Sequence, residues 1–494
     1  MTNQAEAVHD VESVTDSQRW RILAVLLVAI FMSLVGVSIV NVALPSIQNG
    51  LDASESSLQW VLSGYALTFG VVLVAAGRAG DLMGRGGVFV LGVSVFTLAS
   101  VAAGLAPDTL SLNAARFVQG VGSGLINPQG VGMIQQYFRG AARAKAFGAF
   151  GSVVGVAVGI GPPLGGLLIE LGGPEIGWRL TFLLNVPVGL LCLALAFAWF
   201  PKPLLHRPAT AGAEGGASGV WRSLDPVGSI LLGLAVLATM LPFVEGGASA
   251  WFWLSLPAGI GLGWAWVRWE RHYRATGRSP MVDLGIFSIR SFTRGSTIAM
   301  LYFLGMTSIW VIVALYLQQG TGKSALQAGL IGVPSAVLAA VSSNWAGDRV
   351  VRHGRKVVIG GLLLALVGLV SSIAVVLLQS GGYVSEWWLL LTLAFIGAAQ
   401  GSVISPNQTL TLAEVPLSYA GSSGAVMQTG QRIGTSIGIA VITSVTFATL
   451  AASSWPIAMS VGFGLIIVVV LVTLAVAVLD QRDRPAPEGS TGST

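Results

Sequence analysis

Charged residues are scarce in this sequence of 494 residues. Asp, Glu, Lys and Arg together make up 10% of it, whereas hydrophobic residues make up 54%. An ordinary soluble domain carries about 25% charged residues, so the composition excludes a soluble protein and indicates a polytopic membrane protein. Cysteine is almost absent as well. The single Cys192 cannot form an internal disulfide, and we expect it to pack inside a helix bundle.

Motifs of ATP-driven and metal-dependent proteins are missing too. The sequence has no phosphate-binding loop of the GxxxxGK[ST] type and no group of residues at metal-ligand spacing. A convergent set of acid, base and nucleophile is not visible either. We therefore expect no cofactor, no metal ion and no enzymatic activity.

Long apolar runs are what the sequence has in abundance. Fourteen runs of roughly 20 residues occur between residues 20 and 479, each long enough to cross a bilayer of about 30 Å as a helix. The predicted fold class is therefore an all-α membrane protein with fourteen transmembrane helices. The N-terminal segment lacks a basic start and a cleavage site, so we expect the first span to be retained.

The distribution of Lys and Arg predicts the orientation. With the N-terminus inside, all but four of the 26 basic residues lie in cytoplasmic segments. The exceptions are Arg179 and Lys323 outside, and Arg116 and Arg432 within spans. Because cytoplasmic loops are enriched in basic residues, we predict a multi-pass protein of the inner (plasma) membrane with both termini in the cytoplasm. The net charge of +5 then reflects topology, and no nucleic-acid partner is expected.

A weak internal repeat divides the chain into two halves. Gly77 and Gly84 after the second run have the same spacing as Gly347 and Gly354 after the tenth. An offset of eight runs fits two six-span halves that flank two extra spans. The predicted segments are a cytoplasmic tail (1–19), a six-helix bundle (20–200), a cytoplasmic linker (201–223), two inserted helices (224–268), a second linker (269–291), a second six-helix bundle (292–479) and a cytoplasmic tail (480–494).

The segment 151–166 is the richest in glycine. Gly155 and Gly159 lie four residues apart, on one helical face, so a neighbouring helix can approach them closely. Pro162 cannot donate a hydrogen bond to the helix, which predicts a bend near the outer end of this span. Gly166 ends the segment.

The fourth run carries the most unusual residue. Placing an arginine at the centre of a membrane helix costs about 2.5–3.5 kcal/mol, so Arg116 is predicted to be functional, with Gln119 beside it. Arginine stays protonated, so it can act on protons only through a partner.

Other polar and aromatic residues within the runs are candidates for lining a cavity. Asn41 would be costly in lipid and should face the bundle, where it contacts either a substrate or only a neighbouring helix. Tyr65 lies deep in the second run. The remaining candidates are Tyr302, Trp310, Gln400, Asn407, Gln428 and Arg432.

Several of these patterns resemble one family. The glycines and proline of 155–166, in the order GxxxGxGPxxGG, resemble the antiporter signature in the fifth span of exporters of the major facilitator superfamily. The order RxxQGxG at Arg116 resembles that family's fourth-span signature, whose arginine is linked to proton transfer. Residues 178–189, WRLTFLLNVPVG, resemble the start of the sixth span in fourteen-span drug exporters.

The loop after the second run resembles the most widespread signature of the same superfamily. Gly77, Asp81, Gly84 and Arg85 match it, whereas Leu82 stands where a basic residue is usual. The resemblance implies a cytoplasmic gate, in which the carboxylate meets a helix end and the arginine meets a nearby acid. Helix termini attract charges of opposite sign.

The resemblance implies a major facilitator fold and a drug:proton antiporter. Such a protein would export lipophilic drugs, dyes or a secreted metabolite by alternating access. Its partners would be a small-molecule substrate, protons and the lipid bilayer, and it would act as a monomer. Two alternatives stay open, a uniporter or importer of organic anions and a non-transporting membrane scaffold.

One departure from the family pattern bears on the coupling ion. The family usually has an aspartate in the first span where this sequence has Gly36, and no other span replaces it. Asp225, Glu245 and Glu170 are the acids nearest the membrane. Because a buried cation needs an opposite charge, neutral or anionic substrates are expected. Protons would then use Asp81 or an ionisable group of the substrate.

Overall fold

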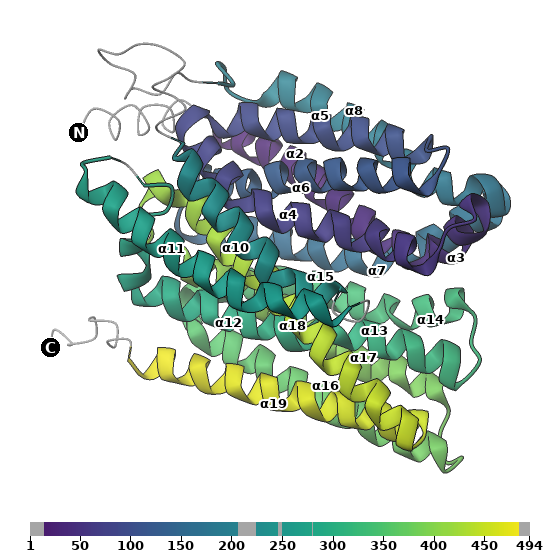
Figure 1. Ribbon diagram of the computed structural model, residues 1–494. Coiled ribbons are helices and arrows are strands. Elements are labelled where there is room, and N and C mark those ends of the chain that lie inside the picture. Colours follow the sequence, from purple (N-terminus) through teal and green to yellow (C-terminus); the bar gives the residue numbers. More distant parts are fainter. Residues whose placement is uncertain (1–13, 206–223, 246–248, 279, 484–494) are drawn as a thin grey trace, which may run out of the picture.

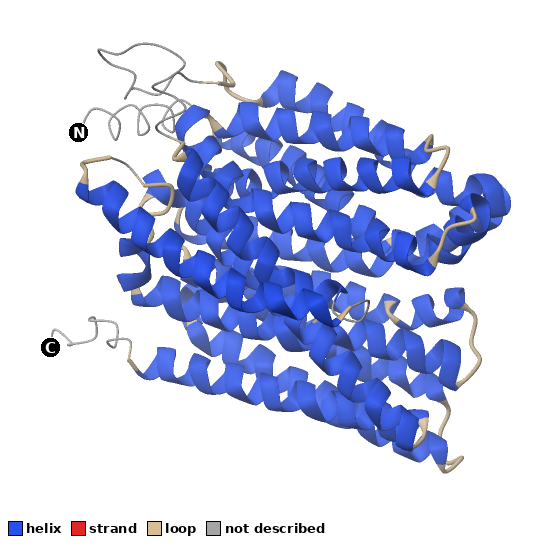
Figure 2. Ribbon diagram, viewed as in Figure 1, coloured by secondary structure: helices blue, strands red, loops and turns tan. Residues whose placement is uncertain are grey.

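A computed structural model describes residues 14–205, 224–245, 249–278 and 280–483, and this part of the chain is helical and contains no strand (Figures 1 and 2). The first half consists of α2 (Asp16–Ser38), α3 (Val40–Leu51), α4 (Glu55–Met83), α5 (Arg85–Gly104), α6 (Thr109–Tyr137), α7 (Gly140–Leu183) and α8 (Asn185–Trp199). Three stretches lie outside the described residues: 1–13 of the predicted tail 1–19, 206–223 of the predicted linker 201–223, and 484–494 of the predicted tail 480–494.

The rest of the chain forms an inserted pair and a second half. The inserted pair is α10 (Pro226–Glu245) and α11 (Ser255–Ala275). The second half consists of α12 (Arg290–Met306), α13 (Ser308–Leu315), a π-helical turn (Tyr316–Gly320), α14 (Ala325–Ile331), α15 (Val333–His353), α16 (Arg355–Ser380), α17 (Leu389–Thr411), α18 (Ala420–Ala452) and α19 (Trp455–Arg482). The two halves lie side by side as separate groups of helices, with α10 and α11 in front of them (Figure 1).

The internal repeat appears in the structure as two equivalent helix ends. Gly84 follows α4 with φ 104°, and Gly354 follows α15 with φ 54°. Glycine adopts positive φ without the steric cost that a Cβ imposes. In both places an arginine, Arg85 or Arg355, begins the next helix.

Apolar side chains form separate cores in the two halves. One cluster, around Phe463 and Leu369, draws its buried residues only from the second half. Another, around Phe147, belongs mainly to the first half but also contains Leu412 and Met427. This shared core lies on the side where α2 begins and α19 ends, called the terminal side below. The two halves are therefore packed together on the terminal side.

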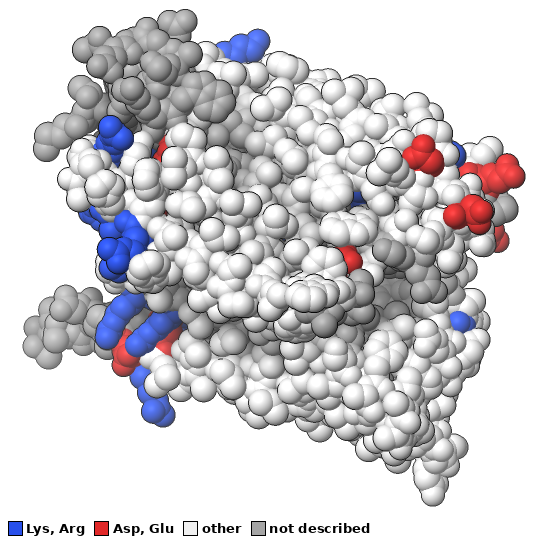
Figure 3. All heavy atoms as spheres, viewed as in Figure 1, with Lys and Arg blue, Asp and Glu red and all other residues white. Residues whose placement is uncertain are grey.

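Twelve of the described helical segments are long and apolar enough to cross a membrane. Gly173, with φ 67°, divides the long element α7: the part before it is the span Gly140–Gly173, and the part after it joins α8 in the span Glu175–Trp199. The helices α6 and α11 are not among the twelve. Basic residues gather at the terminal side of the face shown in Figure 3, and acidic residues gather at the opposite end.

Some segment boundaries differ from those expected from sequence. The helix α7 continues through Pro162, and its non-helical residue is Gly173. The helix α19 continues past residue 479 to Arg482. Asp480, which was expected in the tail, is buried in this helix and accepts a hydrogen bond from Arg355. The expected linker 269–291 is structured, since α11 runs to Ala275 and Met281 is fully buried in the shared core.

The inserted pair lies where α4 of the first half and α18 of the second half meet. Gly70 of α4 accommodates Met240 of α10, and Gly233 of α10 accommodates Val71 of α4. The same apolar cluster includes Ile433 of α18. The helix α10 therefore contacts both halves.

Candidate functional site

The two halves meet closely along α7 and α15. A Cβ on Gly155 would lie 2.8 Å from Ala339 Cβ, and one on Gly159 would overlap Ala336. Ser343 Oγ donates to the carbonyl of Gly148 at 2.9 Å. Glycines let helices approach at backbone distance in a membrane. This contact between the halves, the α7–α15 seam below, therefore depends on the absence of side chains on α7.

A second glycine face of α7 contacts its own half. A Cβ on Gly161 would overlap Ser38, and one on Gly165 would lie 2.9 Å from Ile39 Cγ1. By contrast, Gly166 has only Leu326 nearby, at 3.9 Å. The helix α7 is thus packed between the first half and α15.

The second contact between the halves is centred on Asp81 at the terminal side. Asp81 Oδ1 accepts the N–H of Gly421 and Oδ2 accepts the N–H of Ser422, each at 2.9 Å. These are free donors in the first turn of α18, where a negative charge is favourable. Gly77 allows the approach, since a Cβ there would lie 2.7 Å from the carbonyl oxygen of Gly421. We call this contact the Asp81 clasp.

Arg85 completes the clasp. Its Nη2 lies 2.7 Å from Asp81 Oδ1, and its Nη1 donates to Gln136 Oε1 at 2.6 Å. Nη2 also donates to the carbonyl of Leu417, in the second half, at 3.2 Å. Arg85 follows Asp81 by four residues, just after the turn at Gly84. Both side chains contact the chain at or just before the N-terminus of α18. Arginine suits this position because its planar donors can serve several acceptors at once.

Arg116 is enclosed within the first half. Its side chain is 1% exposed, and its Nε donates to the carbonyl of Val61 at 2.8 Å. Nη1 donates to Gln119 Oε1 at 2.6 Å, and Cζ lies 4.3 Å from the centre of the Tyr65 ring. Among the described residues, Arg116 is held by neutral oxygens and aromatic rings and forms no ion pair.

Gly36 lies directly beside this arginine. Arg116 Nη1 reaches the carbonyl oxygen of Gly36 at 3.4 Å. A Cβ on Gly36 would lie 3.2 Å from Phe96 Cζ and 3.9 Å from Asn185 Nδ2. The position where the family usually has an aspartate is thus occupied here by backbone alone.

A polar network not predicted from the sequence extends inward from Tyr65. Its hydroxyl is hydrogen-bonded to Ser123 Oγ, which lies 2.6 Å from Ser33 Oγ. Asn127 Nδ2 donates to the same Ser33 oxygen at 3.3 Å. Arg116, Ser123 and Asn127 follow one another at helical spacing on α6, which is the sequence signal that could have identified the network.

Arg432 reaches from the second half into the first. Its Cζ lies 4.1 Å from the centre of the Phe69 ring, a cation–π distance. Gln428, one turn earlier on α18, is 7% exposed. Neither Arg432 nor Arg116 has a carboxylate partner among the described residues, so both bring positive charge to the interior of the protein.

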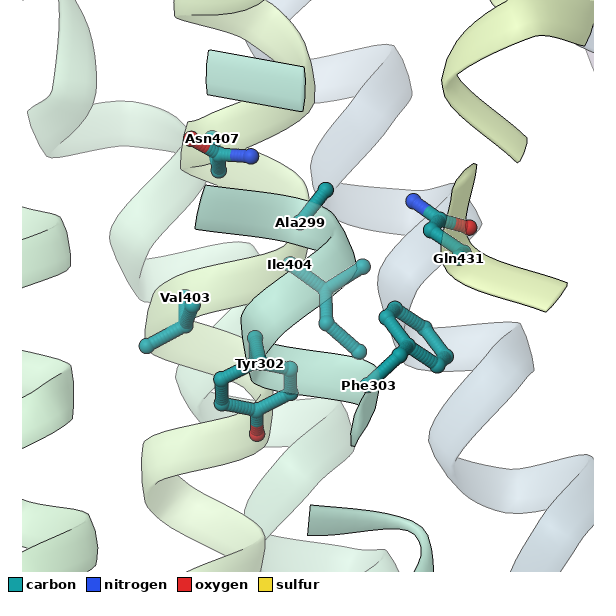
Figure 4. Close-up of a pocket in the computed structure, with 7 residues that line it drawn as sticks. All are labelled: Ala299, Tyr302, Phe303, Val403, Ile404, Asn407 and Gln431. Carbon is teal, nitrogen blue, oxygen red and sulfur yellow. The ribbon is translucent and has the colours of Figure 1, made fainter. Parts of the chain in front are cut away.

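In the second half, Tyr302 and Asn407 line one small pocket of about 10 Å³ (Figure 4). The other lining residues are Ala299, Phe303, Val403, Ile404 and Gln431. They come from α12, α17 and α18. Tyr302 is 3% exposed, and its hydroxyl has no hydrogen-bond partner among the described residues. A buried hydroxyl without a partner is costly, and a pocket of this volume holds at most about one water molecule.

Asn407 also belongs to a buried ion network missed at sequence level. Its Oδ1 accepts from Arg355 Nη1 at 2.5 Å, and Arg355 Nε donates to Asp480 Oδ2 at 2.6 Å. The side chains of Arg355 and Asp480 are 1% and 3% exposed. This network ties the ends of α16, α17 and α19 together inside one half.

The remaining predicted lining residues are dispersed. Asn41 is exposed on α3, whereas Gln400 and Trp310 are partly buried. Trp310 lies near Gly332, at the start of α15. Glu245, at the end of α10, is 1% exposed and accepts a hydrogen bond from Ser63 Oγ at 2.7 Å. The structure therefore brings Tyr65, Arg116 and Gln119 together and leaves Asn41 apart from them.

Comparisons with known proteins agree with this architecture. The family profile described as Major Facilitator Superfamily matches residues 26–439. The chain is 32% identical to the "Probable actinorhodin transporter" of Streptomyces coelicolor, over 88% of this chain and 73% of that protein. It is 29% identical to the "Tetracenomycin C resistance and export protein" of Streptomyces glaucescens, over 86% of this chain and 75% of that protein.

A solved structure has the same fold. The proton:xylose symporter XylE superimposes with a TM-score of 0.65 at 16% identity, covering 96% of this chain and 97% of that one. Fold, family profile and relatives together define a multi-pass membrane transporter and not an enzyme. The chain belongs to the major facilitator superfamily.

Proposed function

We propose that this chain is a fourteen-span exporter of lipophilic small molecules that works by alternating access as a drug:proton antiporter. The observation that carries the proposal is the Asp81 clasp. It joins helices of opposite halves through the backbone amides of Gly421 and Ser422, so it must break whenever the halves part on the terminal side. A contact that only one of two states can make is a gate.

The count of fourteen spans rests on α6 and α11. With 29 and 21 residues, these helices are about 44 and 32 Å long at 1.5 Å per residue. The low hydropathy of α6 comes from residues such as Arg116 and Gln129 that are buried inside the bundle. The helix α11 packs on α10, where Gly259 lies against the backbone of Thr239. Both would cross the membrane beside their neighbours.

The proposed orientation places the terminal side in the cytoplasm. Arg139, Arg143 and Lys145 lie there, at the start of α7. Enrichment of basic residues marks the cytoplasmic side of membrane proteins. The protein would then act as a monomer in the plasma membrane, and the structure would represent a state closed toward the cytoplasm.

The proposed substrates are neutral or anionic. Arg116 and Arg432 bring positive charge to the interior, and Gly36 supplies no carboxylate to balance a cation. Relatives are named for actinorhodin and for tetracenomycin C, which favours secreted small molecules as substrates. Protons would use Asp81 or an ionisable group of the substrate itself.

The same two arginines favour a second candidate, a uniporter or importer of organic anions. Export and import differ in which side releases the substrate, and uniport does not respond to a proton gradient. We would reconstitute the protein in liposomes and measure transport of a panel of neutral, anionic and cationic fluorescent compounds with and without an imposed pH gradient. Gradient-driven transport of neutral or anionic dyes is the expected result. Transport of anions that ignores the gradient would favour the uniporter, and no transport of any compound would favour a scaffold.

A further inference from the structure

A second cluster of buried charges lies beside the Asp81 clasp, where the inserted pair meets α4. Asp225 precedes α10 and is fully buried, and Glu270 near the end of α11 is 2% exposed. Both carboxylates face Gly228: a Cβ there would lie 3.1 Å from Glu270 Oε1 and would overlap Asp225 Oδ2. Arg78 of α4, 5% exposed, interacts electrostatically with both of them and with Asp81.

The cluster is poor in hydrogen bonds. Asp225 Oδ1 accepts from the N–H of Gly228 at 3.0 Å and from Trp269 Nε1 at 2.9 Å, but Oδ2 accepts none from the described residues. Both oxygens of Glu270 and two nitrogens of Arg78 also lack a partner there. Leaving a buried charged group unsatisfied is costly. Two donors within 3.0 Å hold Asp225 Oδ1, whereas no donor in the described part of the chain is in hydrogen-bonding geometry with either oxygen of Glu270, so a proton on Glu270 removes more of this cost.

Arg78 is the cation that holds the two carboxylates ionised in the closed state. Arg85 pairs with Asp81 at 2.7 Å, and Arg78 faces both Asp225 and Glu270. The nearby Arg274 and Asp283 pair with each other at 2.6 Å. Tyr419 donates to Asp283 Oδ2, and its pKa is raised by burial and by Asp283, so it stays neutral. The indole of Trp266 and the backbone N–H groups of Met281 and Val282 point toward Glu270 without reaching hydrogen-bonding geometry. Tyr273 faces Asp225, and the exposed Arg278 lies over the Tyr273 ring, with Cζ 5.5 Å from the ring centre.

We propose that Glu270, beside Asp225, is a proton site, and that Arg78 links the protonation of Glu270 to the opening of the cytoplasmic gate. In the closed state, the amides of α18 and Arg85 satisfy Asp81, so Arg78 is available to the two carboxylates. When the clasp opens, Asp81 loses the two amides and attracts Arg78. The carboxylate pair then loses its cation, and Glu270 takes a proton from cytoplasmic water.

The proton returns to the same water when the gate closes. This site therefore does not carry protons across the membrane. It makes the gate sensitive to cytoplasmic pH, so acidification favours the open gate. The inference rests on the proposed alternating access and orientation, but it does not depend on which substrate is moved or on whether transport is coupled to protons.

The test measures the gate directly. We would place spin labels on Ala141→Cys and His353→Cys, which are exposed at the terminal ends of α7 and α15, and measure their distance in lipid nanodiscs by pulsed electron resonance. Cys192 is fully buried and would not be labelled. The open-to-closed ratio of the native sequence should rise as the pH falls, by up to about tenfold per pH unit for one linked proton. The double variant Asp225→Asn, Glu270→Gln should be more open and insensitive to pH.

Asp483→Asn is the matched control. Its carboxylate also lies at the terminal side, but a hydrogen bond from Arg294 lowers its pKa, so it stays ionised. This variant should keep the native response. A double variant that responds to pH like the native protein, or a native protein without any response, would overturn the proposal.

Infrared difference spectra give a second measurement that needs no labels and no transport. Lowering the pH should produce the carbonyl band of a protonated carboxyl group, and this band should be missing in Glu270→Gln. In Arg78→Gln the band should be present even in the closed state, because Glu270 has lost its cation. A band that is unchanged in both variants would contradict the assignment of the proton to Glu270. Failure of transport in liposomes would leave these results untouched.

Discussion

Asp81 Oδ1 lies 2.9 Å from the backbone nitrogen of Gly421, a residue 340 positions later in the chain. This one hydrogen bond joins α4 of the first half to the N-terminus of α18 in the second. The α7–α15 seam joins the halves elsewhere through glycines and short side chains. Transport by alternating access requires that the clasp be broken and remade in every cycle.

Removal of the charge at Asp81 tests the clasp. In Asp81→Asn, Gly421 and Ser422 lose an ionised acceptor, and hydrogen bonds to charged groups contribute about 1.5–3 kcal/mol. We expect the gate to shift toward the open state by about tenfold or more, with reduced transport and normal membrane insertion. The distance between labels on α7 and α15 measures the shift.

Asp348→Asn is the control for this change, since Asp348 is an exposed carboxylate on the repeat-related helix α15. It should transport like the native protein. An unchanged gate distance in Asp81→Asn would mean that the clasp contributes nothing to closure.

The α7–α15 seam should not tolerate side chains. Gly159→Leu places a side chain into Ala336, and Gly155→Leu places one against Ala339. Both variants should reach the membrane but lose transport, because the halves can no longer pack and rock against each other. Gly464→Leu is the matched control, since no atom lies within 4 Å of a Cβ there. Normal transport by Gly159→Leu would refute the role of the seam.

Arg116 should be required as an arginine. Arg116→Ala leaves the acceptors at Val61 and Gln119 without their donor, and transport should fall to background. Arg116→Lys should restore little, because a lysine cannot reach several acceptors with one planar group. Flux per inserted protein is the measurement, and Arg349→Ala, at an exposed arginine, controls for loss of charge. Native flux in Arg116→Ala would make this arginine a dispensable structural residue.

Gly36→Asp should change substrate preference. A Cβ at this position points toward Phe96 and Asn185, and the Gly36 carbonyl already contacts Arg116. The new carboxylate would offset part of the positive charge, so inhibition by quaternary ammonium compounds should increase relative to anionic ones. Gly36→Asn has similar size without the charge and should leave the preference unchanged. The same preference in both variants would show that cavity charge does not select the substrate.

The sequence by itself determined the membrane class, the repeat of turn glycines in the two halves and the presence of Arg116 within an apolar run. These features are local: apolar runs set helices, turn glycines at 84 and 354 end them, and an arginine in an apolar run must find acceptors. Helical spacing also indicated that Gly155 and Gly159 share a face. It could not tell which helix they contact.

Only the tertiary structure decided which residues meet. Asp81 and Gly421, Arg432 and Phe69, and Arg355 and Asp480 are far apart in sequence, and no spacing rule pairs them. The burial of Glu270 and Asp225 beside Arg78 also depends on where the inserted pair packs. Electrostatic interactions depend on distance in space and on removal from water. Where the charges of this chain act was therefore fixed by helix packing, not by their order in the sequence.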